Sequence, residues 1–352
     1  MTESQPSTTR ESKPPQQQTA GFSSAKTAQR LPTEPMAPQL IDIQPGGGVI
    51  IRLEQQWGRM RRWYLKTFRP GYVARMQGLR QGEHNPCPHE VLDPRDLKFH
   101  RNQGGWFWRT KDDPFTWRER IPFARSGLAE LILIASLAFG VAGLLALISW
   151  QQHWQGIAAW LSWAAVSALS VIGLLVVWFF RDPNREVPQG ERLVVSPADG
   201  KVVTIREIEH EEYIGGPAIE IGIFLSIFSV HINRMPVAAR VIGLRYRPGK
   251  CLNALRSESA RENEQLAIRI EANAHPHRRM IVRQITGAIA RRIVCWLKPG
   301  DELTAGERLG MIKLGSRTEL VLPREESLEL RVQVGQMVKA GSSVLAEYPG
   351  KP

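Results

Sequence analysis

The sequence is poor in cysteine, and its first 40 residues contain no long hydrophobic run. The three cysteines, Cys87, Cys251 and Cys295, are odd in number and far apart along 352 residues. They suit neither a disulfide framework nor a paired CxxC metal site, so a reducing compartment is expected. The missing hydrophobic run argues against a secretory signal peptide at the start of the sequence.

Acidic residues are also in short supply. The chain has 34 Asp and Glu against 46 Lys and Arg, which gives a formal net charge of +12. An excess of this size favours an anionic partner, either nucleic acid or an acidic membrane surface. Charge alone does not distinguish between the two.

Residues 1–48 are rich in Ser, Thr, Gln and Pro and have few apolar side chains. Such a segment buries too little apolar surface to offset the entropy lost on ordering its backbone. The composition therefore predicts a disordered tail, and we expect its deletion to leave the activity of the protein intact.

Two hydrophobic runs, Leu128 to Trp150 and Ile157 to Phe180, are each longer than the roughly 20 residues that a helix needs to cross a bilayer. The alternative is a pair of buried helices in a soluble protein. Both runs are apolar on all sides, however, and Glu130 is their only charged residue. We predict a transmembrane helical hairpin over residues 127–180.

Arginines indicate the orientation of this hairpin. They flank both runs, whereas the short connection QQHWQG has neither Lys nor Arg. The flanking residues are Arg118, Arg120, Arg125, Arg181 and Arg185. Because basic flanks stay on the cytoplasmic side of a cell membrane, both termini and the domain after the hairpin are expected there.

Residues 49–126 alternate basic and aromatic side chains, as in WGRMRRWYLKTFRPGYVARM. Such a pattern is compatible with stacking on single-stranded nucleic acid, with an anionic membrane surface, or with ordinary solvated structure. No nucleic-acid-binding motif accompanies it, and a predicted hairpin follows directly. We favour a juxtamembrane region on acidic lipid and expect no nucleic-acid partner.

The motif HNPCPH contains three side chains that can bind metal, His84, Cys87 and His89. Their spacing matches no common zinc pattern, and no second pair of ligands follows. Pro86 and Pro88 favour a shaped loop instead. We predict no metal site.

Residues 181–352 consist mainly of short Val- and Ile-rich runs separated by Gly, Pro and Asp, a pattern typical of strands. A helix is expected around Ser257 to Glu271. Residues 299–312 and 334–347 form a weak repeat in which Gly300 matches Gly335 and Gly306 matches Gly341. The repeat predicts a barrel-sandwich-like C-terminal part of a β-rich α+β domain.

Four segments of this domain resemble the phosphatidylserine decarboxylase family. They are FFRDPNREVP (179–188), SPADGKVV (196–203), FLSIFSVHINRMPV (224–237) and GERLGMIKLGSRTELVLP (306–323). The resemblance covers about residues 179–348 and follows the order of the family motifs. It implies a membrane lyase that is made as a zymogen and cuts its own chain.

The resemblance places the cut between Gly315 and Ser316, so that a chain of residues 1–315 and one of residues 316–352 stay associated. Ser316 becomes a covalent pyruvoyl group, and no diffusible cofactor is needed. Asp199 and His231 would form an Asp-His-Ser arrangement with this serine, because a hydroxyl is a weak nucleophile until an oriented base removes its proton. Taken singly, Asp199 could equally belong to an Asp-Gly turn and His231 could be a buried structural histidine.

The sequence departs from long-form relatives at two arginines. Arg234 replaces a second histidine in HINRMP, and Arg317 follows the Gly-Ser pair. Both features resemble the short-form branch of the family. A guanidinium binds phosphate in a bidentate manner, so either arginine is a candidate for the lipid phosphate, or is simply structural.

The resemblance implies decarboxylation of phosphatidylserine to phosphatidylethanolamine in phospholipid biosynthesis. The pyruvoyl ketone would condense with the substrate amine and accept the electron pair left by carbon dioxide. The alternatives are an ether-linked serine lipid as substrate, or a membrane-anchored binding module that retains the fold without catalysis. No pattern in the sequence predicts the oligomeric state.

Overall fold

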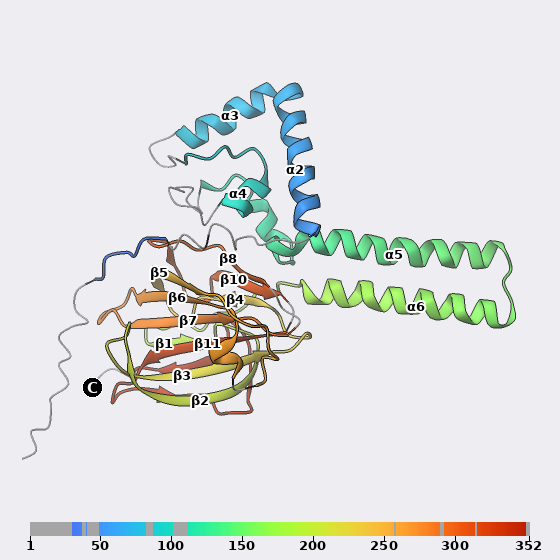
Figure 1. The fold of residues 1–352 in the computed structure, drawn as a ribbon. Helices are drawn as coiled ribbons and strands as arrows, with labels where there is room; N and C mark the ends of the chain where they lie inside the picture. Colours follow the sequence, from blue (N-terminus) through green and yellow to red (C-terminus); the bar gives the residue numbers. More distant parts are fainter. Residues whose placement is uncertain are drawn as a thin grey trace, which may run out of the picture.

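The computed structural model describes residues 30–36, 40, 49–81, 87–100, 112–256, 258–288, 292–313 and 315–349. Figure 1 shows three parts: a group of helices, a pair of long helices that project together, and a β-rich body. The chain passes through them in that order.

The first group contains α2 (Val49–Phe68), α3 (Pro70–Gln81) and α4 (Pro94–His100). Pro70 begins α3, where a residue without an N–H leaves no helix hydrogen bond unmade. These helices and the loops beside them bury a small apolar cluster. Its members are Leu65, Met76, Cys87, Val91, Leu92, Leu97 and Phe115.

The juxtamembrane region thus has a core of its own. Cys87 from the HNPCPH motif lies in that core, whereas His84 lies outside the described residues. Two short 3-10 helices, η3 (Thr116–Arg120) and η4 (Arg125–Gly127), lead to the long pair.

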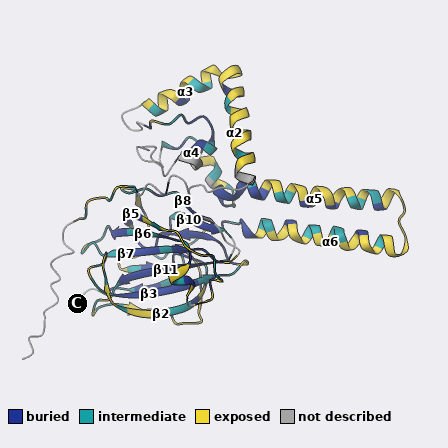
Figure 2. Cartoon of the chain, viewed as in Figure 1, coloured by how far each residue is buried: buried dark blue, intermediate teal, exposed yellow. Residues whose placement is uncertain are grey.

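The projecting pair consists of α5 (Leu128–Gln151) and α6 (Gly156–Phe179), within one residue of the predicted bounds. The two helices lie side by side, and Gly173 lets the Phe139 ring pack closely, since a Cβ there would come within 2.6 Å of it. Most of their surface is exposed (Figure 2). By length and composition both could cross a membrane, with mean hydropathies of 2.7 and 2.1.

The body is antiparallel throughout the described strands and contains one large sheet. Its order is β13 (Met337–Val338), β2 (Gly200–Glu211), β3 (Gly216–Leu225), β11 (Ser316–Pro323), β7 (Arg279–Ile285), β6 (Gln265–Ala272), β5 (Ala239–Arg247), β9 (Glu302–Leu303). One smaller sheet has the order β4 (Ile232–Arg234), β10 (Arg308–Lys313), β8 (Arg292–Cys295), and the other β1 (Leu193–Val195), β14 (Val344–Glu347), β12 (Glu329–Leu330).

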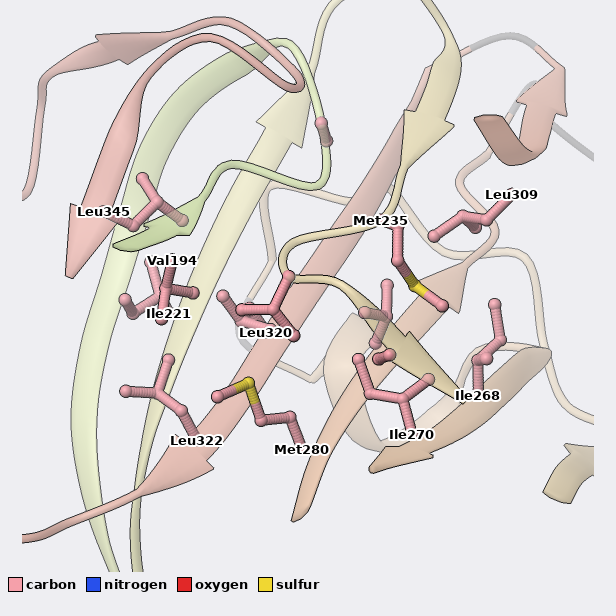
Figure 3. Packing of buried hydrophobic residues seen from close by; sticks show 14 of the residues in the cluster. Val194, Ile221, Met235, Ile268, Ile270, Met280, Leu309, Leu320, Leu322 and Leu345 are labelled. Atoms are coloured by element: carbon pink, nitrogen blue, oxygen red, sulfur yellow. The ribbon is translucent and has the colours of Figure 1, made fainter. Parts of the chain in front are cut away.

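The main core lies between these sheets. Successive side chains of a strand point to opposite faces, so Leu320 and Leu322 of β11 enter this core while Val321 joins a smaller cluster on the other face. Figure 3 shows Leu320 close to Ile221 and Val194, which come from β3 and β1. Ser316 begins the same strand, four positions before Leu320.

The helix expected around Ser257 to Glu271 is wrong over most of its length. Only α7 (Ser259–Glu262) is helical, and β6 follows. The sequence QLAIRIEA places Leu266, Ile268 and Ile270 two residues apart, all fully buried in the main core. A period of two is the strand pattern, and burial of that face determines the outcome.

Part of the predicted disordered tail packs on the body. Glu34 donates its backbone N–H to the Ile242 carbonyl (2.7 Å), and its carboxylate pairs with Arg269 (2.7 Å) and Arg245 (3.0 Å). Leu40 is buried in the main core. Residues 1–29, 37–39 and 41–48 lie outside the described residues.

The weak repeat has matching backbone conformations. Gly300 and Gly335 have φ of 93° and 98°, and Gly306 and Gly341 have φ of 76° and 74°. These values lie in the left-handed region, which explains why both copies keep glycine. The short strands β9 and β13 occupy opposite edges of the large sheet. The barrel-sandwich likeness itself stays a prediction.

Candidate active site

The structure gathers the four family-like segments in one region. Asp182, just after α6, pairs with Arg234 of β4 (2.7 Å) and with Arg308 of β10 (2.5 Å). The Arg234 N–H donates to the carbonyl of Pro197 (2.9 Å) in the SPADG segment. Segments far apart in sequence therefore meet beside β4 and β10.

Gly315 joins two sheets, since β10 belongs to the smaller sheet and β11 to the large one. Its φ of 58° lies in the left-handed region, and an added Cβ there would meet no atom within 4 Å. Backbone conformation, rather than crowding of the carbonyl, thus favours glycine. The Gly315 carbonyl oxygen lies against Gly287, where an added Cβ would come within 2.0 Å of it.

Ser316 is the first residue of β11 and pairs with Leu225 of β3. It is fully buried, and its Oγ makes no hydrogen bond to any described residue. Thr318, on the same face of β11, accepts a hydrogen bond from Asn233 Nδ2 (3.1 Å). Gln284 donates to Asn233 Oδ1 (2.8 Å), so the serine stands at the end of a buried polar row.

His231 precedes β4 and is 1% exposed. Its Nδ1 lies 2.9 Å from the Ser229 carbonyl oxygen, which can only accept. In the neutral ring Nδ1 therefore carries the proton and Nε2 is left as the acceptor. Nε2 is buried without a hydrogen-bond partner among the described residues. Phe179, at the end of α6, packs on the ring at 4.4 Å between centroids.

The pKa of His231 is lowered to about 4, mainly by burial; the hydrogen bond to Ser229 opposes this shift, and the charge of Arg181 adds to it. The imidazole is therefore neutral at pH 7 and available as a base.

Asp199 lies close to this region but does not contact the histidine. Its carboxylate accepts hydrogen bonds from Arg185 (2.6 Å) and from the Ala340 N–H (2.7 Å). No hydrogen bond joins Asp199 to His231 in the part of the chain that the structure describes. Arg181 is electrostatically coupled to both groups.

The two arginines considered for phosphate are buried and already paired. Arg234, 7% exposed, bonds Asp182 and the Gly306 carbonyl (3.0 Å). Arg317, 3% exposed, pairs with Glu319 (2.8 Å). Arg317 also extends from β11 on the face opposite to Ser316, as neighbours in a strand do. Their binding of lipid phosphate stays a prediction.

The loop that leads to His231 is clamped to the end of α6. The Phe228 carbonyl accepts hydrogen bonds from Trp178 Nε1 (3.2 Å) and Arg181 (2.9 Å). The side chains of Ile227 and Phe228 are 44% and 60% exposed beside this clamp. An exposed apolar tip therefore lies where α6 meets the body.

A second contact links α5 to the segment before the Gly-Ser pair. Lys313, the last residue of β10, forms an ion pair with Glu130 in the first turn of α5. Lys313 Nζ also donates to the Ser126 carbonyl (3.4 Å). Both side chains are nearly buried, so the end of β10 is held to the base of the projecting helices.

Sequence reasoning missed several of these residues. Gly287 follows a strand-like run and resembles an ordinary turn residue. Nothing in the neighbouring sequence indicates that the Gly315 carbonyl oxygen lies against it. Asn233 and Gln284 are polar residues in two separate strands, and nothing in either strand's sequence indicates that their side chains meet. Glu130 did carry a signal, because an ionisable residue in a hydrophobic run usually has a partner. The sequence does not identify that partner as Lys313.

Comparisons with known proteins agree with the motifs. A family model described as phosphatidylserine decarboxylase matches residues 172–346. A phosphatidylserine decarboxylase proenzyme of Rhodopirellula baltica is 50% identical over 252 residues, which cover 72% of this chain and 99% of that protein. The proenzyme of Syntrophus aciditrophicus is 40% identical over 238 residues, covering 68% of this chain and 100% of that protein.

Proposed function

The chain belongs to the phosphatidylserine decarboxylase family, and we propose that it removes carbon dioxide from the serine headgroup of phosphatidylserine to give phosphatidylethanolamine. The observation that carries the proposal is the buried Ser316 hydroxyl, which has no hydrogen-bond partner among the described residues and comes directly after Gly315 in the family-like segment. A buried hydroxyl without a partner costs stability, which suggests a chemical use.

In the proposed self-cleavage, Ser316 Oγ attacks the Gly315 carbonyl carbon. An ester bond forms, the peptide C–N bond breaks, and the amine of Ser316 is released. Loss of the Cα proton and of the Cβ–Oγ bond then leaves a Gly315 carboxylate and dehydroalanine. Water converts the dehydroalanine to pyruvoyl and ammonia.

His231 supplies the base for these steps, because its Nε2 has a free lone pair at neutral pH. Asp199 is the third member of the proposed set. In the uncut chain its carboxylate is held by Arg185, so we assign it an indirect effect on His231. The charge of Arg181 interacts with both Asp199 and His231 and would transmit that effect.

The pyruvoyl group fits this position, because the only side chain it needs is the serine that the fold already buries. Once formed, it supplies an electrophilic carbonyl that binds an amine and accepts an electron pair. The burial of Ser316 along β11 keeps water away from that carbonyl. In this proposal His231 holds or delivers a proton at that carbonyl.

The two chains stay associated in this proposal. Residues 316–352 contain β11, which lies between β3 and β7 in the large sheet, and also β12, β13 and β14. Separating the chains would break the pairing on both sides of β11 and expose Leu320 and Leu322. The cost of exposing two buried leucines alone is about 3–6 kcal/mol.

The active site would face the membrane from the cytoplasmic side. α5 and α6 cross the bilayer as a hairpin, with arginines at the body end and none in the connection. The exposed Ile227 and Phe228 would then lie at the lipid surface, three to four residues from His231. A serine headgroup would thus reach the site without leaving the bilayer.

Release of labelled carbon dioxide tests the proposal. Purified protein in mixed micelles with phosphatidylserine labelled in the serine carboxyl should release label, and a diether serine lipid offered separately reports on the lipid backbone. Label from the diether substrate alone would move the assignment to an ether-lipid decarboxylase. Label from neither lipid by cleaved protein would favour a non-catalytic binding module.

A further inference from the structure

We infer that α2 is a membrane-surface helix that lies on the headgroups of an anionic bilayer. The inference rests on the proposed crossing of the same membrane by α5 and α6. It concerns a helix well before residue 172, where the match to the family begins.

The first observation is an apolar stripe on α2 that the described part of the chain leaves uncovered. Leu53, Trp57, Met60 and Tyr64 recur at spacings of four, three and four, so they share one face of the helix. Their exposed fractions are 52%, 57%, 60% and 45%. Figure 2 shows the same exposure along α2.

A different face of α2 packs on the chain. Leu65 lies in the small apolar cluster, and Arg62 pairs with Asp96 of α4 (2.5 Å). Arg61 pairs with Asp93 (2.6 Å). These contacts fix the rotation of the helix, so the apolar stripe is held outward and has no partner among the described residues of this helical group.

The charge of α2 is suited to acidic lipid. The helix has four arginines and lysines other than Arg62, and Glu54 is its only acidic residue. Arg52 and Arg59 are exposed beside the apolar stripe. Aromatic side chains with flanking basic residues are typical of helices that lie in the membrane interface.

The position of α2 relative to α5 also suits a helix that lies on the membrane surface. Its first end contacts α5, and it runs crosswise to α5 beside the first turn of that helix (Figure 1). When α5 crosses a bilayer, a helix crosswise to its base lies along the membrane surface. A second copy of the chain would cover the stripe equally well but would leave the adjacent arginines without an acidic partner.

Depth-dependent quenching tests the inference on the full chain in lipid nanodiscs. Single cysteines at Met60→Cys on the stripe and Gln55→Cys on an exposed position of the other side receive an environment-sensitive fluorophore. Cys251→Ser removes the half-exposed native thiol. Leu144→Cys on α5 reports on insertion of the proposed hairpin independently.

In nanodiscs with phosphatidylglycerol, lipids with a shallow spin label should quench the Met60 probe several-fold more than the Gln55 probe. Replacing Arg52 and Arg59 by Gln should weaken the surface-bound state by about fivefold per charge, and neutral phosphatidylcholine should do the same. The Leu144 probe should be quenched by deep labels in every case.

Equal quenching at Met60 and Gln55, with the Leu144 probe still quenched, would overturn the inference and leave the hairpin intact. Protection of Met60 that depends on protein density in the bilayer would overturn it in favour of a second copy. Failure of the Leu144 probe to meet deep labels would instead contradict the proposed hairpin.

Discussion

Gly287→Ala is expected to slow self-cleavage by roughly a hundredfold or more without unfolding the protein. The added methyl would come within 2.0 Å of the Gly315 carbonyl oxygen and within 3.3 Å of the Ala254 side chain. An ordinary carbon–oxygen contact is about 1 Å or more longer than the first of these distances. Either the carbonyl or the strand connection therefore has to move by that amount.

The displaced carbonyl is the one that Ser316 attacks. A misplacement of about 1 Å lowers the rate of a reaction between positioned groups by roughly a hundredfold, so cutting should slow by at least that factor. The stability cost should stay within about 1–3 kcal/mol, as is typical for one extra methyl in a packed site. Gly287 lacks a positive φ, so alanine adds no backbone strain there.

A time course after cell-free synthesis would measure the rate, with the uncut and cut chains separated on a gel. Gly216→Ala is the matched control, because its added Cβ meets no atom within 4 Å. Cutting of the Gly287→Ala chain at the wild-type rate, with the Gly216→Ala chain also normal, would refute the proposed geometry of the scissile carbonyl.

Three further results are expected. Because the pKa of His231 is about 4, the cleavage rate should stay flat from pH 7 to about 5 and fall near 4. The free energy of unfolding should also decrease as pH falls from 6.5 to 4, since only the unfolded chain takes up that proton in this range. A cleavage rate that falls through pH 6.5 would exclude His231 as the base. Glu130→Gln should remove the ion pair with Lys313 at the base of α5, cost about 3–5 kcal/mol and slow cutting. The charge swap Glu130→Lys with Lys313→Glu should restore the cutting rate, and a swap no better than the single change would mean that the pair does not position β10. Deleting residues 1–29 should leave the thermal midpoint unchanged, whereas Glu34→Ala should lower the free energy of unfolding by about 1–3 kcal/mol in a urea titration.

Patterns that reflect local physics were predictable from the sequence. The bounds of α5 and α6 follow from composition, because each is a long run that is apolar on all sides and a helix satisfies its own backbone hydrogen bonds. The paired glycines of the repeat follow from the left-handed backbone that both turns require. The helix expected near Ser257 failed because burial of a two-residue alternation outweighed local propensity.

The candidate site shows the same contrast between local sequence patterns and long-range contacts. Ser316, His231 and Asp199 were predicted from the motifs, and the fold brings the motif segments together, while their catalytic roles stay a prediction. The contacts that hold them are long-range. The pairing of Asp199 with Arg185, and the approach of Gly287 to a residue 28 positions later, depend on how the sheets stack, which no sequence window reports.

The intact mass of the purified protein and of its Ser316→Ala variant tests the central claim most directly. The wild type should consist of a chain of residues 1–315 and a chain of residues 316–352 that begins with pyruvoyl, and the variant should be a single uncut chain. Two chains from Ser316→Ala with the same junction, or a small wild-type chain that begins with an unmodified serine, would contradict self-cleavage through Ser316.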